Sequence, residues 1–337
     1  MADLQGHKRG KRAVKNKPVL MFMYEKILSF LKENFFSRSQ SYNGSSISEK
    51  DFITFKRADE STVVAAVDGG DAVILDSGPW IISKIRVAFT EYCGKRIKEG
   101  KKEYLLLVSF SDKGISFETS SKDNVDELLP DFNALKGLKL PVDRILEIPP
   151  LVRKYSEYMT ALKLAQDSKK LVIMDQLLES ELNPDFLNEA GIKVLQHENI
   201  AGIAKTSRIR TAEGRSLLGY LNERSSKLKT LWYYITDSSK FIDMCAKLDI
   251  HSKYIYRIQM SAKAKPEKIL GIISDYSKDS LIIGYPYPLI RADSIARIPE
   301  HERRREERIL KAQSFKFLNY DSNSENFHSL MDKAMYK

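Results

Sequence analysis

STVVAAVDGG, residues 61–70, is a run of apolar and β-branched residues that ends in an aspartate and two glycines. A run this short and this apolar is typical of a buried strand. A carboxylate where such a strand emerges is unfavourable unless it meets a cation or hydrogen-bond donors. The glycines permit a tight turn or the close approach of another group. Two interpretations follow: Asp68 binds a metal ion that holds a phosphate, or Asp68 and its glycines form a hairpin turn.

KKLVIMDQLL, residues 169–178, repeats this pattern with a short apolar strand that runs into Asp175. If the two strands are neighbours in one sheet, Asp68 and Asp175 converge. Two carboxylates at that separation repel each other unless a proton or a cation lies between them. Mg²⁺ and Mn²⁺ prefer such oxygen ligands, so the sequence predicts a divalent-metal site where the strands end.

The bulk composition narrows the class of protein. The chain has 337 residues, enough for one large or two smaller domains, with 42% hydrophobic and 30% charged residues. Its net charge of +10 favours a polyanionic partner such as nucleic acid, although an ordinary basic surface gives the same number. Neither GxxxxGK[ST] nor GxGxxG occurs, so nucleotide hydrolysis has no motif support.

Cysteine usage and hydropathy indicate the compartment. Cys93 and Cys245 are in no metal-ligand spacing, which argues against a cysteine zinc site and fits a reducing interior. No apolar run is long enough to span a bilayer, and the N-terminus lacks a signal-peptide core. We therefore expect a cytoplasmic protein without a membrane segment.

Four regions are predicted along the chain. Residues 1–17 form a disordered basic arm, either a solvated tail or a loose phosphate-binding segment. Residues 18–48 are an N-terminal helix and linker; the amphipathic helix, Val19 to Phe36, is expected to pack in the core, with docking on a second subunit as the alternative. Residues 49–320 are the main domain, and residues 321–337 are a C-terminal tail.

Within the main domain, the first half reads as an antiparallel meander whose strands are 63–68, 72–75, 80–89, 104–110 and 115–119. A helix over 151–166 then leads into the strand before Asp175, and another strand spans 199–205. Residues 213–250 are predicted to be a helical insertion, in which aromatic residues 232–234 either pack in the core or stack on bases. A strand over 254–260, a buried strand over 281–283, a helix over 290–298 and a solvated helix over 300–311 complete the domain.

The order of the two strand–aspartate units and the later segment Gly284-Tyr-Pro-Tyr-Pro-Leu289 resembles the NurA nuclease family of archaea and some bacteria. The resemblance extends from about Val63 to Ile298. The Tyr-Pro-Tyr-Pro-Leu segment is its most specific part, and the segment from Ile200 to Lys205 is similar to the family's strand that ends in lysine.

This resemblance implies an α/β, RNase H-like fold in which helices flank a mixed central sheet, related to the Argonaute nuclease domain. It implies a Mn²⁺-dependent deoxyribonuclease, with Mg²⁺ as the other candidate ion, that cuts 5′→3′ from DNA ends and acts as an endonuclease on single strands. It also implies a homodimer that works with the hexameric DNA translocase HerA in double-strand-break end resection.

Asp68 and Asp175 match the family's metal-binding aspartates. Glu157, on the helix before the second strand, resembles the third acidic ligand; Glu179 and Glu181 are nearby rivals, and an ordinary solvated helix glutamate is the alternative reading.

Lys205 and Tyr285 complete the implied site. Lys205 resembles a residue that holds the scissile phosphate. Tyr285 matches the tyrosine of the Tyr-Pro motif, where it positions the phosphate, stacks on a terminal base, or only stiffens the turn.

Two positions depart from the family pattern. Gln176 replaces a glycine after the second aspartate, and Asp293 stands where the family tends to have a histidine. An aspartate can still bind a hard cation, so Asp293 is a fourth candidate ligand, but it is no base of imidazole strength near neutral pH. Two alternative functions stay open: a catalytically weakened nuclease-like protein that regulates a translocase, and a plain DNA-binding protein with no metal requirement.

Overall fold

The structure is a computed structural model that describes residues 17–36, 40–58, 62–112, 114–120, 126–131, 142–179, 184–280 and 282–313. The predicted basic arm, apart from its last residue, and the predicted C-terminal tail lie outside these ranges. The chain divides into two compact units. The smaller comprises Met1–Glu49 and Arg208–Ser225, and the larger comprises the rest. In the described part of the chain, no helix combines the length and the hydropathy that crossing a membrane requires.

The smaller unit contains helices α1 (Lys17–Leu31) and α5 (Leu217–Arg224). Glu213 accepts hydrogen bonds from the backbone N–H and the hydroxyl of Ser41, each at 2.8 Å, which ties the two parts of this unit together. The predicted N-terminal helix is present. Its residues Tyr24, Ile27 and Leu28 are 54–63% exposed, so the expectation that its apolar face packs in a core is not met within this unit.

The larger unit is built on one ten-stranded mixed sheet of order β1-β8-β9-β10-β7-β6-β2-β3-β4-β5. The pairs β2–β6 and β6–β7 are parallel, and the remaining pairs are antiparallel. The strands are β1 (Ile53–Phe55), β2 (Val63–Asp76), β3 (Trp80–Cys93), β4 (Lys95–Ser111), β5 (Gly114–Ser120), β6 (Lys170–Met174), β7 (Ile200–Ala204), β8 (Leu231–Asp237), β9 (Phe241–Lys247) and β10 (Tyr256–Ser261).

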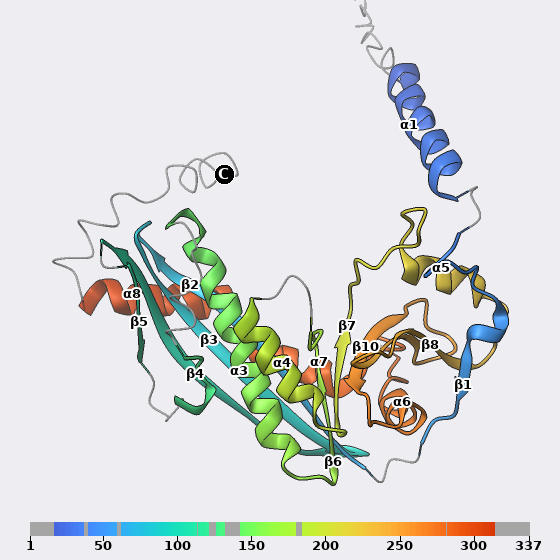
Figure 1. Ribbon diagram of the computed structural model, residues 1–337. Helices are drawn as coiled ribbons and strands as arrows, with labels where there is room; N and C mark the ends of the chain where they lie inside the picture. The colour runs from blue at the N-terminus through green and yellow to red at the C-terminus, as the bar shows by residue number, and fades with distance from the viewer. Residues whose placement is uncertain are drawn as a thin grey trace, which may run out of the picture. The chain divides into compact units, whose positions relative to one another are not determined.

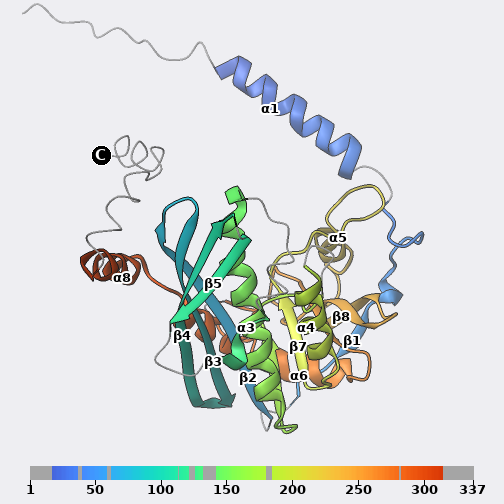
Figure 2. The ribbon, with the colours of Figure 1, turned by 60° about the vertical axis from the view of Figure 1, so that its left-hand side comes forward.

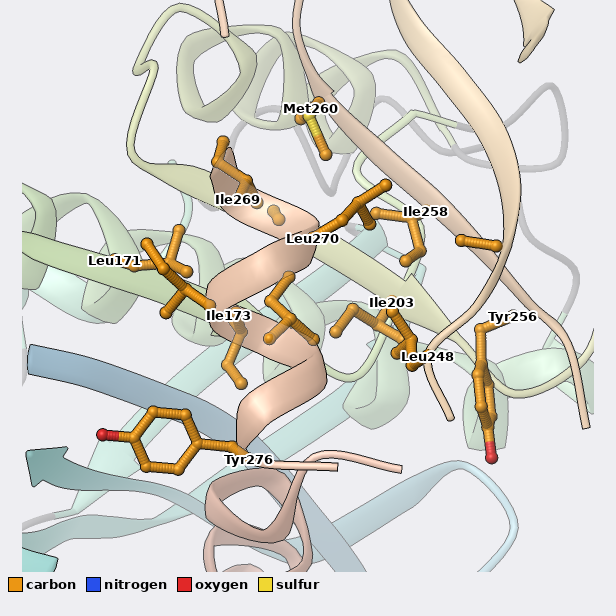
Figure 3. Close-up of a cluster of buried hydrophobic side chains, with 14 of the residues drawn as sticks. Leu171, Ile173, Ile203, Leu248, Tyr256, Ile258, Met260, Ile269, Leu270 and Tyr276 are labelled. Carbon is orange, nitrogen blue, oxygen red and sulfur yellow. The ribbon is translucent and has the colours of Figure 1, made fainter. Parts of the chain in front are cut away.

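Helices cover both faces of this sheet (Figures 1 and 2). Along β2 the side chains alternate: Ala65 and Val67 pack under α3 (Ile148–Ala165) and α4 (Asp185–Leu195). Val64 and Ala66 face α6 (Pro266–Asp275) and α7 (Tyr287–Ala296). Figure 3 shows how α6 lays Ile269 and Leu270 over the apolar residues of β6, β7 and β10. The period-2 alternation of strands thus fills two separate cores.

The helix α8 (Glu300–Gln313) forms as predicted, but one of its sides is not solvated. The buried side chains of Lys84 and Arg86 on β3 form ion pairs with Glu302, and Lys84 also pairs with Glu306 at 3.0 Å. Charges on a buried strand face need such partners, so α8 supplies them.

The predicted strands 63–68 and 72–75 are one continuous strand, β2, and the hairpin-turn interpretation of Asp68-Gly-Gly is wrong. Pairing with β3 runs without interruption through Asp68, Gly69 and Gly70. The glycines serve close packing instead. A Cβ at Gly69 would collide with the Glu157 carboxyl of α3, and one at Gly70 with the carbonyl oxygen of Ala296 in α7.

The prediction of a helical insertion over 213–250 is wrong beyond α5. Residues 231–237 and 241–247 are the antiparallel strands β8 and β9. The aromatic and β-branched residues of β8 favour a pleated, half-buried surface. Trp232 is fully buried and its ring lies 4.6 Å from that of Phe52, centroid to centroid, which is core packing and leaves no face free for a base.

The predicted buried strand over 281–283 is also wrong at its two described residues; Leu281 lies outside the described part of the chain. Ile282 and Ile283 lie in a turn and are 43% and 37% exposed. Gly284 follows with φ of +95°, a left-handed conformation that glycine adopts without strain. The turn reverses the chain so that Tyr287 and Pro288 begin α7, three residues earlier than the predicted helix.

Candidate active site

Asp68 and Asp175 lie side by side on neighbouring parallel strands. In the pairing of β2 with β6, Val67 is opposite Met174, and the two aspartates are the next residues of their chains. By strand alternation both carboxylates point to the face that carries Ala66 and Ile173, which is the face covered by α6 and α7. The predicted convergence of the two aspartates is therefore observed, although Asp68 lies within its strand and only Asp175 follows the end of one.

Lys205 reaches the same place from the next strand. It follows β7, whose Gly202 pairs with Met174 of β6. Its ammonium group forms an ion pair with Asp175 and lies 4.9 Å from the ring centroid of Tyr285. The ammonium group of Lys205 and the ring of Tyr285 thus lie beside the aspartate pair.

Tyr285 enters the site from the turn before α7 and is 3% exposed. Its ring centroid lies 5.4 Å from that of Tyr256 on β10. The hydroxyl is buried and has no hydrogen bond of normal geometry within the described chain. Burial and then the charge of Asp175 raise the pKa of Tyr285 well above its ordinary value. Tyr285 therefore lies next to Asp175 and Lys205.

Glu157 approaches from the opposite face of the sheet, on α3. It is fully buried, which excludes the solvated-glutamate alternative. Its carboxylate forms an ion pair with Arg153, one helical turn earlier. Arg153 also donates to Asp71 at 2.8 Å and to the carbonyl of Gly69 at 3.2 Å. Burial is the main cause that raises the pKa of Glu157.

Of the two rivals of Glu157, only Glu179 lies in the described part of the chain. The backbone N–H of Glu179 donates to Gln259 at 3.0 Å, and Glu181 lies outside the described residues. The i,i+4 spacing of Arg153 and Glu157 was visible in the sequence and could have identified Glu157 as a paired residue. Sequence reasoning missed Arg153.

Asp68 is the least compensated carboxyl of the site. It is 7% exposed and accepts one hydrogen bond, at 2.8 Å, from the backbone N–H of Gly69. No cationic side chain of the described chain forms an ion pair with it. Burial, followed by the charges of Glu157 and Asp175, raises the pKa of Asp68 to about 8. A buried carboxyl with two acidic neighbours and no cation is a common feature of functional sites.

The chemistry of this donor set fits a hard divalent cation, which would remove the repulsion around Asp68 and finds its preferred oxygen ligands there. The side chains as they stand offer two neighbouring donors rather than a closed cage: within the described ranges, no three acidic, histidine or cysteine side chains are grouped so that they could hold an ion together. Glu157 is bound by Arg153. The pair Asp68 and Asp175 is thus the part of the predicted ligand set whose placement fits an ion.

Asp293 projects from α7 and pairs with Arg297 at 2.9 Å. Its charge contributes to the raised pKa of Asp68, so the structure brings it near the pair. Together with Lys205 and Tyr285 it lines a cavity of about 360 Å³. Tyr254 and Tyr256 line the same cavity, and no local signal marked either of them, because both belong to an ordinary strand pattern.

The backbone at Gln176, the other departure from the family pattern, packs closely against the neighbouring strand β7. Its backbone oxygen occupies the position that a Cβ of Gly202 would take, so the glycine on β7 provides room for the turn after Asp175. Its side-chain amide nitrogen is buried and has no hydrogen-bond partner in the described part of the chain.

Comparison with known proteins places these features in a family. The family model of the NurA domain matches residues 62–298. The crystal structure of the NurA nuclease from Sulfolobus solfataricus is similar over 91% of this chain and 98% of that chain, with a TM-score of 0.56 and 14% sequence identity.

The catalytic domain of human Endonuclease V aligns over 86% of this chain and 98% of that chain, with 14% identity and a TM-score of 0.37. No curated protein sequence matches the chain. The predicted α/β fold, an RNase H-like mixed central sheet with flanking helices, is confirmed.

Proposed function

The chain belongs to the NurA family, and on this premise we propose that it is a metal-dependent DNA nuclease that hydrolyses phosphodiester bonds. The observation that carries the proposal is the placement of Asp68 beside Asp175 on parallel strands, with Asp68 buried and without a cationic partner among the described side chains. The net charge of +10 is consistent with a polyanionic substrate.

Asp68 and Asp175 are the proposed ligands of Mn²⁺ or Mg²⁺. Such an ion supplies charge stabilisation at phosphorus and a more acidic water. Glu157 and Asp293 are the proposed further ligands, and each would exchange its arginine, Arg153 or Arg297, for the ion.

Lys205 and Tyr285 are proposed to hold the scissile phosphate. The Lys205 side chain is 49% exposed, so its ammonium group can turn from Asp175 to a non-bridging phosphate oxygen with little rearrangement. The Tyr285 hydroxyl is buried and makes no hydrogen bond of normal geometry in the described chain, so it is available to donate to the same phosphate.

We propose the finer properties from family membership: 5′→3′ exonuclease and single-strand endonuclease activity, a homodimer, and cooperation with a hexameric HerA-type translocase in double-strand-break end resection. A cytoplasmic location is proposed from the cysteine usage and the hydropathy of the sequence.

The test compares Asp68→Asn and Asp175→Asn with the wild type on end-labelled single-stranded and duplex DNA, with Mn²⁺, with Mg²⁺ and with chelator. We expect each substitution to reduce metal-dependent cleavage by at least about 100-fold, because each removes a charged ligand. Glu118→Gln, an equivalent change at an exposed position of β5, is the matched control and should cleave normally. Cleavage at the wild-type rate by both aspartate variants would reject the proposal.

One observation favours a second candidate function. Glu157 and Asp175 are each already paired with a cation, Arg153 or Lys205, and Gln176 and Asp293 depart from the family pattern. These features fit a weakened nuclease that binds and regulates a DNA translocase. Such a protein would change the ATPase rate of the translocase and would show no metal-dependent cleavage.

A further inference from the structure

The cavity beside the aspartate pair has an aromatic and aliphatic lining that the phosphate chemistry does not use. Its volume is about 360 Å³, and Tyr254, Ile282 and Ile290 are among the residues that line it. Tyr254 is 64% exposed and Ile282 is 43% exposed. Large apolar side chains gathered around an open hollow indicate a surface that binds a flat or apolar group.

The position of Tyr254 is fixed although its ring is exposed. The backbone N–H of Tyr254 donates to the hydroxyl of Ser252 at 3.0 Å, and that hydroxyl donates back to the Tyr254 carbonyl at 3.3 Å. Ser252 also packs against Gly284, so closely that a Cβ there would collide with it. The loop that contains Tyr254 therefore packs against the turn that contains Tyr285. These contacts fix the backbone of Tyr254, although its ring is exposed.

The residues that line the cavity are of two kinds. Lys205 and Tyr285 lie next to Asp175, and Asp293 is a further charged residue of the lining. Tyr254, Ile282 and Ile290 are aromatic or aliphatic. A ligand that matches both kinds carries a phosphate next to a planar, largely apolar group, and a nucleotide within a DNA strand has this composition. The volume of about 360 Å³ lies within the range of small-molecule pockets, so the cavity has room for one base.

We propose that this cavity holds one unpaired nucleobase of the strand whose phosphate lies at Asp68 and Asp175, with the base stacked on Tyr254. The inference rests on the proposed function, because that function puts the phosphate at the aspartates. A base in the cavity cannot pair with the complementary strand, so the nucleotide next to the scissile bond has to leave the duplex. Stacking on a ring tolerates any base, so the cavity selects unpaired nucleotides with little preference for sequence.

The experiment measures binding of single-stranded DNA by the full chain in the presence of chelator, so that no cleavage is needed. 2-Aminopurine placed at successive positions of the strand reports stacking through its fluorescence, and an abasic nucleotide at the responsive position removes the base. We expect Tyr254→Ala to weaken binding about tenfold and to abolish the fluorescence change, whereas Tyr254→Phe retains both.

The abasic strand provides the decisive comparison. It should bind the wild type about tenfold more weakly than the complete strand and should cause no further loss with Tyr254→Ala, because the ring and the base act as one contact. Tyr24→Ala, which removes a tyrosine of similar exposure (59%) on α1, is the matched control and should behave as the wild type. The inference is overturned by wild-type affinity of Tyr254→Ala, by an abasic penalty that persists in that variant, or by absence of binding to the wild type.

The failure of this inference can be distinguished from failure of the proposed nuclease function. If the wild type cleaves DNA, Asp68→Asn does not, and Tyr254→Ala binds DNA as the wild type does, the proposed nuclease function is supported and the base site is rejected. If no metal ion supports cleavage, but the abasic nucleotide and Tyr254→Ala weaken binding equally and without adding to each other, the base site is supported and the nuclease function is rejected.

Discussion

At the scale of single residues, Asp68 is the unusual group of this protein. Its carboxyl is nearly enclosed, lies near Glu157, Asp175 and Asp293, and is compensated only by the N–H of Gly69 among the described groups. The charged form is therefore unfavourable, and the folded chain carries that cost at neutral pH. Natural proteins keep such groups where binding of a ligand, rather than folding, sets the requirement.

The pKa of Asp68 predicts how stability depends on pH. In the unfolded chain the group loses its proton near the ordinary aspartate pKa of 3.8, whereas in the folded chain it retains the proton up to about 8. The folded state thus binds the extra proton between these values, and the contribution of Asp68 to the free energy of unfolding falls as pH rises through this window.

We expect Asp68→Asn to remove this fall and to be more stable than the wild type at pH about 8, by on the order of 2 kcal/mol. Urea unfolding across the window, without metal, measures the difference. Added Mn²⁺ should stabilise only the wild type at the alkaline end, because it binds the folded carboxylates. Stability profiles that run parallel for the two proteins would contradict the raised pKa.

At the scale of elements, two glycines set how closely helices approach the central strand. Gly69 and Gly70 are consecutive on β2 and therefore present opposite faces of the sheet. One face receives Glu157 of α3, and the other receives the end of α7 at Ala296. The helix that carries Glu157 and the helix that carries Asp293 thus both reach the level of Asp68 because β2 has no side chains next to it.

Gly70→Ala is expected to destabilise the protein by about 1–3 kcal/mol, since the new methyl group would have to displace the backbone of α7. Gly219→Ala is the matched control: this glycine lies in α5, and a Cβ there has only ordinary contacts with Ser216, 3.8 Å away. It should stabilise the helix by up to about 1 kcal/mol. Urea midpoints of the two variants give the comparison, and equal shifts for both would show that close packing does not constrain Gly70.

At the scale of the larger unit, a second cavity lies where β6 and β7 begin. Asp175 follows the other end of β6, so the cavity and Asp175 are separated by the length of this strand, roughly 17 Å. The cavity has a volume of about 400 Å³, and four lysines line it. Lys170 pairs with Glu91 at 3.0 Å. Lys169, Lys265 and Lys268 are exposed and form no ion pair within the described residues, so part of the positive charge is concentrated here.

Replacing Lys169, Lys265 and Lys268 together by alanine is expected to weaken DNA binding at low salt. It should also reduce the slope of log affinity against log salt concentration by about one for each lysine that contacts a phosphate. The same replacement of Lys227, Lys229 and Lys240, which are exposed elsewhere, controls for net charge. Fluorescence anisotropy of a labelled strand at several salt concentrations measures both. Identical slopes for the two triple variants would show that this cavity has no special part in DNA binding.

The local sequence pattern was enough to predict an element when the residues of that element alone determine its conformation. The strand before Asp175, the strand before Lys205 and the helix that carries Glu157 were all predictable, because the apolar period, the helix-breaking residues and the charges that define each element lie within a few residues of each other. The errors at 281–283 and at Asp68-Gly-Gly share one cause: the groups that fix the conformation are remote in sequence, Ser252 for Gly284 and the helices α3 and α7 for Gly69 and Gly70. The error at 231–247 is different, because β8 and β9 are neighbours in the chain that pair with each other, and the aromatic and β-branched residues of β8 were a local signal for a strand.

The sequence by itself determined that this chain carries two strand-borne aspartates, a lysine-terminated strand and a tyrosine–proline turn in NurA order, since these are properties of short segments. Only the tertiary structure decided that Asp68 and Asp175 are level on parallel strands, that Arg153 holds Glu157, and that Tyr254 opens a cavity beside Tyr285. The reason is physical: register, ion pairing and cavities arise from contacts between remote segments, and no local pattern encodes the distance between them.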